Sequence, residues 1–217
     1  MIYYVIPARK NSKGLKFKNR TLFDYTATTI PYNFYSNVIV TTDDEEILNK
    51  SIRMGFHYLE RSSKLSEDTT STKHVLRDVI QQYDIKDDDI IVMLYLTYPN
   101  RSWEDIQDAL DYFNKNNLKS MLCKKEVQSH PFLCMYEKDN DRGQQIIEHN
   151  LYRRQDYPKC FEISHFVTIF EVSELDKLNW NLYNEDTSFF KIKNYVDVDT
   201  GDDYHQFLEN MNDKRTR

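Results

Sequence analysis

The strongest strand signal in the chain is the run DIIVMLYL at residues 89–96. It is apolar after its first residue and shows no alternation with polar side chains. That pattern is typical of a strand buried on both faces at the centre of a parallel sheet. Such a sheet needs helices on both of its faces, because parallel neighbours are joined by crossover connections. The rest of the chain is therefore expected to alternate between strands and helices.

This alternation runs through the first 124 residues. Short runs rich in β-branched and aromatic residues predict further strands at 2–6, 37–41 and 56–60, and KSMLCK predicts another at 119–124. Apolar residues at helical spacing predict helices that begin after Asp43 or Asp44, after Asp68 or a nearby Thr, and after the capping-box pair Ser102 and Asp105. The prediction is an α/β fold, a three-layer α/β/α sandwich around a mostly parallel sheet. Residues of about 125–195 are richer in polar turns and predict a small β-rich insertion in a single domain, 1–217.

Composition narrows the function classes. The 217 residues carry 29 Lys and Arg against 35 Asp and Glu, a net charge of −6, which argues against a general nucleic-acid-binding protein. The three cysteines are too scattered for a zinc site and odd in number for a disulfide framework. No signal peptide and no apolar run long enough for a membrane span is found. We expect a cytoplasmic protein that binds neither nucleic acid nor a membrane.

The N-terminal stretch departs from this acidic average. Between Arg9 and Arg20 the sequence RKNSKGLKFKNR has six cations and no acid. It follows the first predicted strand, so it lies at the carboxyl edge of the sheet, where ligands bind in such folds. Arg9 and Lys13 suit a phosphate, and Gly14 lets backbone N–H groups turn toward an anion. Neither a P-loop nor a dinucleotide fingerprint is present, and a merely solvated basic loop is the alternative interpretation.

An acidic stretch near the other end, VDVDTGDD at 196–203, complements it. If 194–198 is a strand, Asp197 and Asp199 point to the same side, where their repulsion favours a bound cation such as Mg²⁺. The alternative is a pair of surface acids that cap the next helix. A triphosphate with Mg²⁺ would use both stretches, provided that the fold brings them together.

The motifs now resemble a known family. IPARKNSKGLKFKN (6–19) resembles the N-terminal signature of the acylneuraminate cytidylyltransferases, the CMP-sialic acid synthetases, and VDVDTGDD resembles their D-I-D-T motif. Between them, in the family's order, lie segments that resemble its others: VIVTTDDEEI (38–47), RSSKLSEDTTST (61–72), LTYPNR (96–101) and RRQDYPK (153–159). The likeness covers nearly the whole chain.

The resemblance implies a Rossmann-like nucleotidyltransferase fold whose insertion serves dimerisation. It implies attack of a nine-carbon keto-sugar acid on the α-phosphate of CTP, with pyrophosphate released and a homodimer in which subunits share sites. Implied catalytic residues are Arg9, Lys13 and Lys18. Implied CTP-binding residues are Arg9, Asn11, Ser12, Lys13, Asn19, Arg61, Thr70 and Thr72. Implied sugar-binding residues are Tyr95, Arg154, Gln155 and Ser164, and implied Mg²⁺ ligands are Asp197 and Asp199.

The sequence departs from the family pattern mainly in the sugar-facing half. Tyr95-Leu96 replaces Gln-Pro, Tyr98 replaces Ser, and Ser164-His165 replaces Asn-Gly. The bulk of Tyr95 and Tyr98 predicts a smaller or more apolar sugar pocket. Three functions stay open: a cytidylyltransferase for a sialic-acid-like sugar, a related enzyme for another keto acid (pseudaminate, legionaminate or Kdo), and a catalytically weakened homologue that binds nucleotide.

Overall fold

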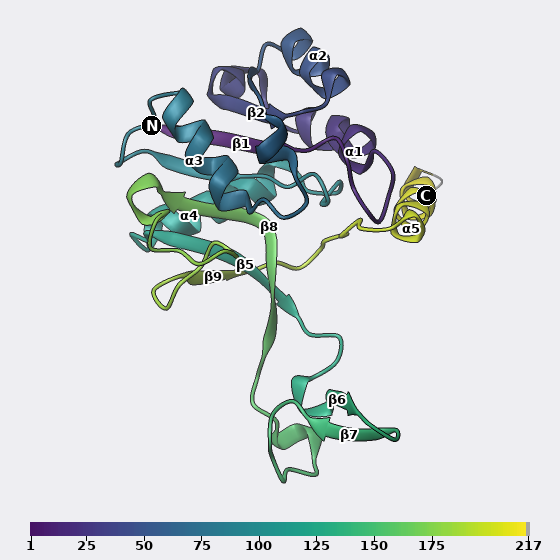
Figure 1. Cartoon of the computed structure of the whole chain (residues 1–217). Coiled ribbons are helices and arrows are strands. Elements are labelled where there is room, and N and C mark those ends of the chain that lie inside the picture. The colour runs from purple at the N-terminus through teal and green to yellow at the C-terminus, as the bar shows by residue number, and fades with distance from the viewer. Residues whose placement is uncertain (216–217) are drawn as a thin grey trace.

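The apolar run forms the middle strand of a seven-stranded sheet in the computed structural model, which describes residues 1–215, with side chains as far as Met211 (Figure 1). The sheet order is β3-β2-β1-β4-β8-β5-β9. Its strands are β1 (Ile2–Ala8), β2 (Val38–Thr42), β3 (His57–Glu60), β4 (Ile90–Met93), β5 (Ser120–Glu126), β8 (Phe161–Glu171) and β9 (Ser188–Lys191). β8 is antiparallel to both of its neighbours and the other pairs are parallel, so the predicted mostly parallel sheet is confirmed.

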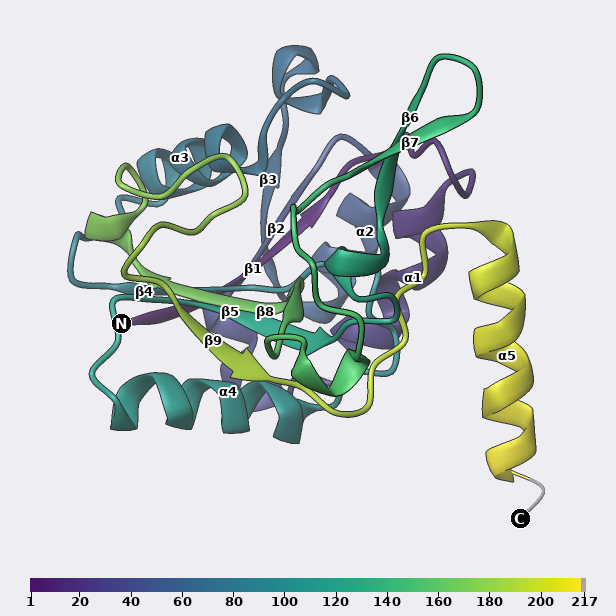
Figure 2. The ribbon, with the colours of Figure 1, turned by 90° about the horizontal axis from the view of Figure 1, so that it is seen from below.

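Helices cover both faces of the sheet, which confirms the three layers (Figure 2). One face packs against α1 (Lys18–Ala27), α2 (Glu45–Met54) and α4 (Trp103–Lys115), and the other against α3 (Thr72–Gln82) and the loop at 172–182. Alternation along β1 places Tyr4 and Ile6 in the first core and Val5 in the second, all at most 1% exposed. Each strand therefore stabilises two cores at once.

The helix ends follow local sequence signals. Asp44 caps α2 by accepting from the backbone of Glu46, and Gly55 ends that helix with a φ of 80°. The predicted capping box of Ser102 and Asp105 is present at α4. The prediction for α3 was wrong in its cap: Ser71, and neither Asp68 nor a threonine, accepts from the first turn. This leaves the Asp68 side chain free for other contacts.

Helix α1 was not predicted from the sequence. It begins at Lys18, inside the cationic stretch, after Phe17 has turned the chain with a left-handed φ of 53°. Its sequence KNRTLFDYTA mixes apolar and polar residues with weak amphipathic spacing, so tertiary packing of Leu22 and Phe23 decides its conformation. The consequence for function is that Lys18 and Asn19 stand on a helix rather than in a loop.

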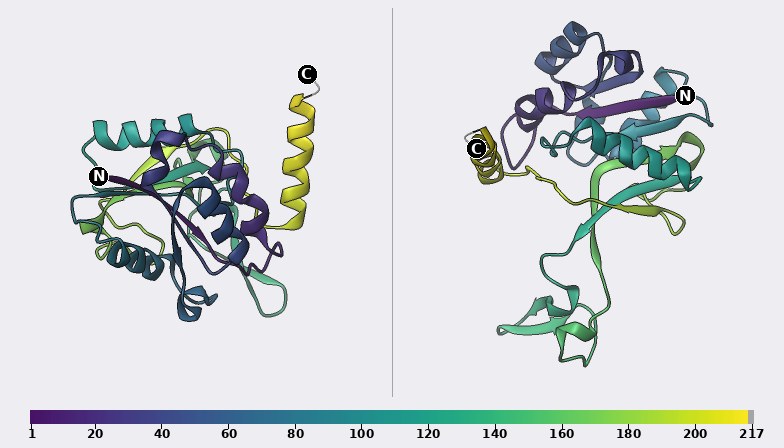
Figure 3. Two further views of the ribbon diagram at one scale, coloured as in Figure 1. Left: turned by 90° about the horizontal axis from the view of Figure 1, so that it is seen from above. Right: turned by 180° about the vertical axis from the view of Figure 1, so that it is seen from behind.

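The predicted insertion is shorter than 125–195, because β8 and β9 belong to the main sheet. Residues 127–160 instead form an arm that leaves the body between β5 and β8 (Figures 1 and 3). The arm contains the small antiparallel sheet of β6 (Met135–Lys138) and β7 (Arg142–Gln145). The predicted β content is confirmed. The prediction differs from the structure because β8 and β9 join the central sheet and only β6 and β7 belong to the arm.

The last helix, α5 (Gly201–Arg215), extends beside the body. Phe207, 2% exposed, packs edge-on against Tyr25 of α1 with 5.1 Å between ring centroids, which anchors the first half of the helix. Within residues 1–215, no helix is both long and apolar enough to cross a membrane.

Candidate active site

The carboxyl ends of β1, β3 and β4 meet at one edge of the sheet, and the loops that follow them enclose a cleft of about 300 Å³. The cleft thus brings together residues from Pro7 to Thr97, which are about 90 positions apart in the sequence. The cleft is lined by Pro7, Arg9, Ser12, Lys18, Asn19, Arg61, Leu65, Glu67, Asp68, Thr70, Thr72, Val75, Tyr95, Leu96 and Thr97. Eight of the residues expected to bind substrate are therefore brought together.

The three cations expected to hold the phosphates each contact an acid. Arg9 Nη1 lies 2.5 Å from Asp68 Oδ1, and Lys13 Nζ lies 3.2 Å from Asp68 Oδ2. Lys18 Nζ lies 2.6 Å from Asp199 Oδ1. Hydrogen bonding to Lys13, with the nearby charge of Arg9, holds the pKa of Asp68 below its usual value. Asp68 belongs to the segment RSSKLSEDTTST that resembles the family, but the sequence alone indicated no role for its carboxylate in the site.

Asn19 and Arg61 both line the cleft, and each is held by a hydrogen bond to a neighbouring segment. The Asn19 amide donates to the backbone oxygen of Arg9 at 2.8 Å, which fixes the cationic loop to α1. Arg61 is 8% exposed and donates through Nε to Thr41, while its buried Nη2 has no hydrogen-bond partner among the described residues. Burial lowers the pKa of Arg61 to about 10. A buried guanidinium nitrogen without a partner marks a place where a polar ligand atom would be stabilised.

The acidic segment docks directly on the cationic loop. A Cβ added to Gly14 would lie 2.2 Å from the backbone oxygen of Asp199, so this close approach requires glycine. Residues 194–198 are extended but form no strand, which corrects the expectation. Val198, between the two acids, is fully buried and donates to Thr97 O at 2.8 Å, which fixes this segment against the loop after β4.

The acids of this segment divide into two groups. Asp203 caps α5 by accepting from the backbone of Thr200 at 2.8 Å, as the helix-cap interpretation required. The backbone of Asp199 also donates to Asp203, at 3.0 Å, but the carboxylates of Asp197 and Asp199 take no part in that cap. Burial, followed by repulsion from Asp199, raises the pKa of Asp197. This is the electrostatic situation that a bound cation would relieve.

The described residues fit Mg²⁺ only together with a substrate. No group of three or more His, Cys, Asp or Glu side chains is placed to hold a metal ion within the part of the chain that the structure describes. Two carboxylates are nevertheless enough for Mg²⁺ when phosphate oxygens and water complete its coordination, as is usual at nucleotide sites. The donor set of Asp197 and Asp199 is of this kind.

The expected sugar-binding residues do not form one group. Tyr95 lies in the cleft itself, and its hydroxyl is 2.5 Å from that of Thr72, on the side expected to bind the nucleotide. Tyr98 is only 5% exposed and its hydroxyl accepts from Ser164, so its ring belongs to the core and does not line the cleft. The smaller or more apolar sugar pocket stays a prediction.

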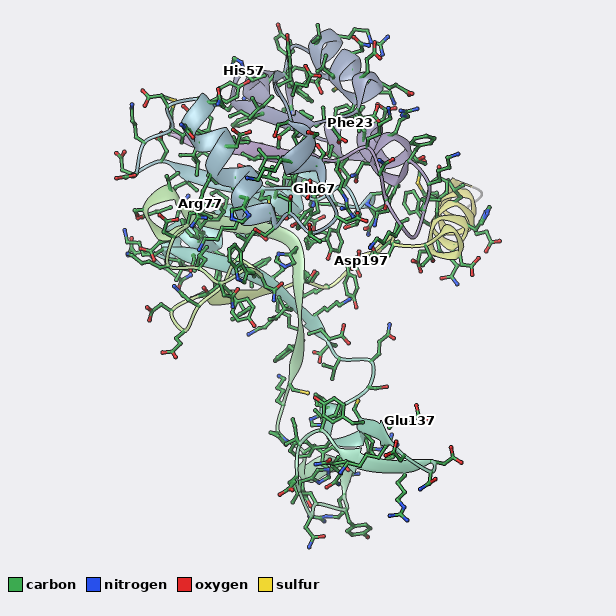
Figure 4. All side chains as sticks on the ribbon, in the orientation of Figure 1. Phe23, His57, Glu67, Arg77, Glu137 and Asp197 are labelled. Atoms are coloured by element: carbon green, nitrogen blue, oxygen red, sulfur yellow. The ribbon has the colours of Figure 1, made fainter. Side chains whose placement is uncertain are left out.

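Arg154 and Gln155 lie on the arm, in the short 3-10 helix at 154–156. Neither lines the cleft of its own chain. Figure 4 shows the separation through two labelled residues: Asp197 lies in the body, whereas Glu137 lies at the end of the arm. Asn11 also lies outside the cleft lining, and Lys13 reaches it only through its contact with Asp68.

The comparisons with known proteins agree with this arrangement. A family model described as cytidylyltransferase matches residues 3–178. The chain belongs to the cytidylyltransferase family. It is 26% identical to an N-acylneuraminate cytidylyltransferase of Streptococcus agalactiae serotype V over 92% of this chain and 51% of the relative, so it spans about half the length of that protein. It is 25% identical to a pseudaminic acid cytidylyltransferase of Campylobacter jejuni over 72% of each chain.

The fold of this cytidylyltransferase family member also has solved counterparts. CMP:2-keto-3-deoxy-manno-octonic acid synthetase, in a structure complexed with CTP, superimposes with a TM-score of 0.68. The match covers 98% of this chain and 99% of the other at 13% identity. At this identity the likeness shows the fold, which confirms the nucleotidyltransferase-like architecture expected from the motifs.

Proposed function

We propose that this chain is a CTP-dependent cytidylyltransferase that converts a sialic-acid-like nonulosonic acid to its CMP-sugar. The observation that carries the proposal is the gathering of Arg9, Lys13 and Lys18 around one cleft, with Asp197 and Asp199 docked beside them. In this reaction the anomeric oxygen of the sugar bonds to the α-phosphorus of CTP. The bond to the bridging oxygen of pyrophosphate breaks, and the hydroxyl proton passes to solvent.

The residues of the cleft have distinct tasks in this proposal. Arg9, Lys13 and Lys18 neutralise the triphosphate and hold the charge that develops on the leaving pyrophosphate. Arg61 supports base recognition, since its buried Nη2 has a free donor, and Thr70 and Thr72 line the same end of the cleft. Asn19 keeps the cationic loop in position through its bond to the Arg9 carbonyl.

Asp197 and Asp199 would hold Mg²⁺ in the loaded enzyme. When bound, this ion supplies charge neutralisation at the phosphates of the nucleotide. Lys18 forms an ion pair with Asp199 at 2.6 Å, and burial, followed by the charge of Asp199, raises the pKa of Asp197. A cation bound together with CTP would therefore stabilise the ionised forms of both carboxylates.

The acceptor half of the proposal depends on a homodimer. A keto-sugar acid needs a cation for its carboxylate, and Arg154 stands on the arm rather than at the cleft of its own chain. The arm exposes several large apolar residues, which favours its use as an interface: Leu133, Met135, Tyr136, Ile146, Ile147, Leu151 and Tyr152. A second copy can place its arm at this site. Light scattering of the purified protein should then give twice the chain mass of 26.2 kDa.

The test is pyrophosphate release from CTP with N-acetylneuraminate, pseudaminate, legionaminate or Kdo as acceptor. The proposal predicts release that depends on both CTP and a sialic-acid-like acceptor such as N-acetylneuraminate, and formation of the matching CMP-sugar. Turnover with pseudaminate, legionaminate or Kdo but not with N-acetylneuraminate would support the related enzyme for another keto acid. CTP binding without turnover on any acceptor would support a catalytically weakened homologue.

A further inference from the structure

Asp68 bridges the two cations at the mouth of the cleft. One carboxylate oxygen lies 2.5 Å from Arg9 and the other lies 3.2 Å from Lys13. The Asp68 side chain is 44% exposed and Lys13 is 81% exposed, so the bridge is at the surface. Asp68 also lines the cleft, next to Glu67. A carboxylate thus holds the ionic contacts that phosphate oxygens would make.

Little else holds this carboxylate in place. Asp68 lies between the 3-10 turn at Ser63–Ser66 and helix α3, and within residues 1–215 its side-chain oxygens contact only the two cations. Asp44 shows what a structural acid looks like in the same protein. It is fully buried, accepts from backbone N–H groups of α2 and is bound by Arg20 at 3.0 Å. The contrast indicates that Asp68 can leave its partners without unfolding its surroundings.

We propose that Asp68 is an internal competitor of the polyphosphate. It occupies Arg9 and Lys13 in the ligand-free cleft, is displaced by the triphosphate of CTP, and returns to the same cations after transfer. Its return lowers the affinity for pyrophosphate and promotes the release of this product. The inference rests on the proposed function, because that function assigns Arg9 and Lys13 to the phosphates.

The opposite role would be an orienting one, in which Asp68 holds the two cations ready for the ligand. The two roles predict opposite signs. Removing a competitor strengthens binding of the polyphosphate, whereas removing an orienting group weakens it. Exposed ion pairs are weak individually and are screened by salt, so the competitor role predicts a moderate effect that shrinks as ionic strength rises.

The experiment is calorimetric titration of pyrophosphate and of CTP into the wild type, Asp68→Asn and Glu67→Gln. Asp68→Asn keeps the shape of the side chain and removes its charge. Glu67→Gln makes the same charge change one residue away, in a side chain that forms no ion pair in the described structure. We expect Asp68→Asn to bind both ligands about 3-fold to 10-fold more tightly at low salt. Glu67→Gln should change affinity less than Asp68→Asn does.

A kinetic measurement supplies a second readout. The inhibition constant of pyrophosphate should fall in Asp68→Asn, and Asp68→Ser should behave alike if the asparagine variant folds poorly. Equal or weaker pyrophosphate binding in the folded variants overturns the competitor role while leaving the proposed function intact. If neither the wild type nor the variants bind CTP or pyrophosphate, the proposed function fails and the inference fails with it.

Discussion

The cleft and the arm differ in where their side chains find partners. In the cleft, Arg9, Lys18 and Asn19 all contact groups of the same body, and Gly14 packs directly on the acidic segment. On the arm, Tyr152 is 91% exposed and Met135 is 64% exposed. The side chains of the first region find partners within one chain, whereas the second region exposes large side chains. The difference teaches that nucleotide binding can be tested on single-chain contacts, while the proposed acceptor binding must also be tested on the arm.

The largest expected effect belongs to the acidic segment. Asp197→Asn and Asp199→Asn should each lower turnover about 100-fold, because an amide is a poor ligand for Mg²⁺. The thermal midpoint of ligand-free Asp197→Asn should not fall, since the change relieves carboxylate repulsion, whereas Asp199→Asn also removes the ion pair with Lys18. Asp202→Asn, an exposed acid in the first turn of α5, is the matched control. Full activity of the double variant at low Mg²⁺ would remove the metal from the proposal.

The contact between the two charged segments can be broken at one glycine. Gly14→Ala would force its methyl group to within 2.2 Å of the Asp199 backbone oxygen, so the loop must move. We expect turnover to fall about 10-fold to 100-fold, because displacements of this size disturb reacting groups. Gly201→Ala is the control, since nothing lies within 4 Å of its added methyl group. Equal activity of the two variants would show that the docking of the segments is unimportant.

The arm is tested through the acceptor. Arg154→Ala should raise the KM for the sugar acid about tenfold and leave the KM for CTP unchanged, because a charge-assisted contact to the carboxylate is lost. The control is Arg153→Ala, because the Arg153 guanidinium is already bound by Asp156 at 2.8 Å. Steady-state kinetics on N-acetylneuraminate, pseudaminate and legionaminate provide the measurement. An unchanged KM for every acceptor would place the carboxylate elsewhere.

The smallest expected effect concerns the chemical reactivity of the three cysteine thiols, and we expect no change of activity to be needed to detect it. Cys123 lies in the sheet core, where burial raises the pKa of its thiol to about 12. Cys134 and Cys160 lie on the arm, and both are half-buried. A thiol reagent at pH 8 should therefore modify Cys134 and Cys160 in the native protein and Cys123 only after unfolding. Rapid modification of Cys123 would contradict the compact core assigned to the body. Mass spectrometry of the modified peptides distinguishes the sites.

The sequence predicted the body better than the arm for a physical reason. The strand at 89–96, the cap at Ser102 and the stop at Gly55 are local signals, and each is confirmed in kind. The antiparallel insertion of β8 between β4 and β5 depends on long-range pairing that no local pattern encodes. The same holds for α1, whose helix depends on the burial of Leu22 and Phe23.

The candidate site divides in the same way. Arg9, Lys18 and Arg61 were predicted because motif order and charge pattern are visible in the sequence, and the cleft unites them. The contact of Asp68 with Arg9 joins residues 59 positions apart, so no local pattern announces it. The predicted insertion at about 125–195 includes Arg154, but the separation of Arg154 from the cleft could not be predicted, since it depends on how far 127–160 extend from the body.

The most direct test of the central claim is calorimetric titration of CTP into the wild type, Arg9→Ala, Lys13→Ala and the control Lys10→Ala. Lys10 belongs to the same loop but lines a separate hollow with Arg20 and Glu46, whereas Lys13 contacts Asp68 at the cleft. We predict that Arg9→Ala and Lys13→Ala each weaken CTP binding tenfold or more, since a charge-assisted contact contributes about 1.5–3 kcal/mol. Lys10→Ala should bind CTP nearly as the wild type does. Equal CTP affinity in all four proteins would contradict the account, because the cationic stretch would then be only a solvated surface.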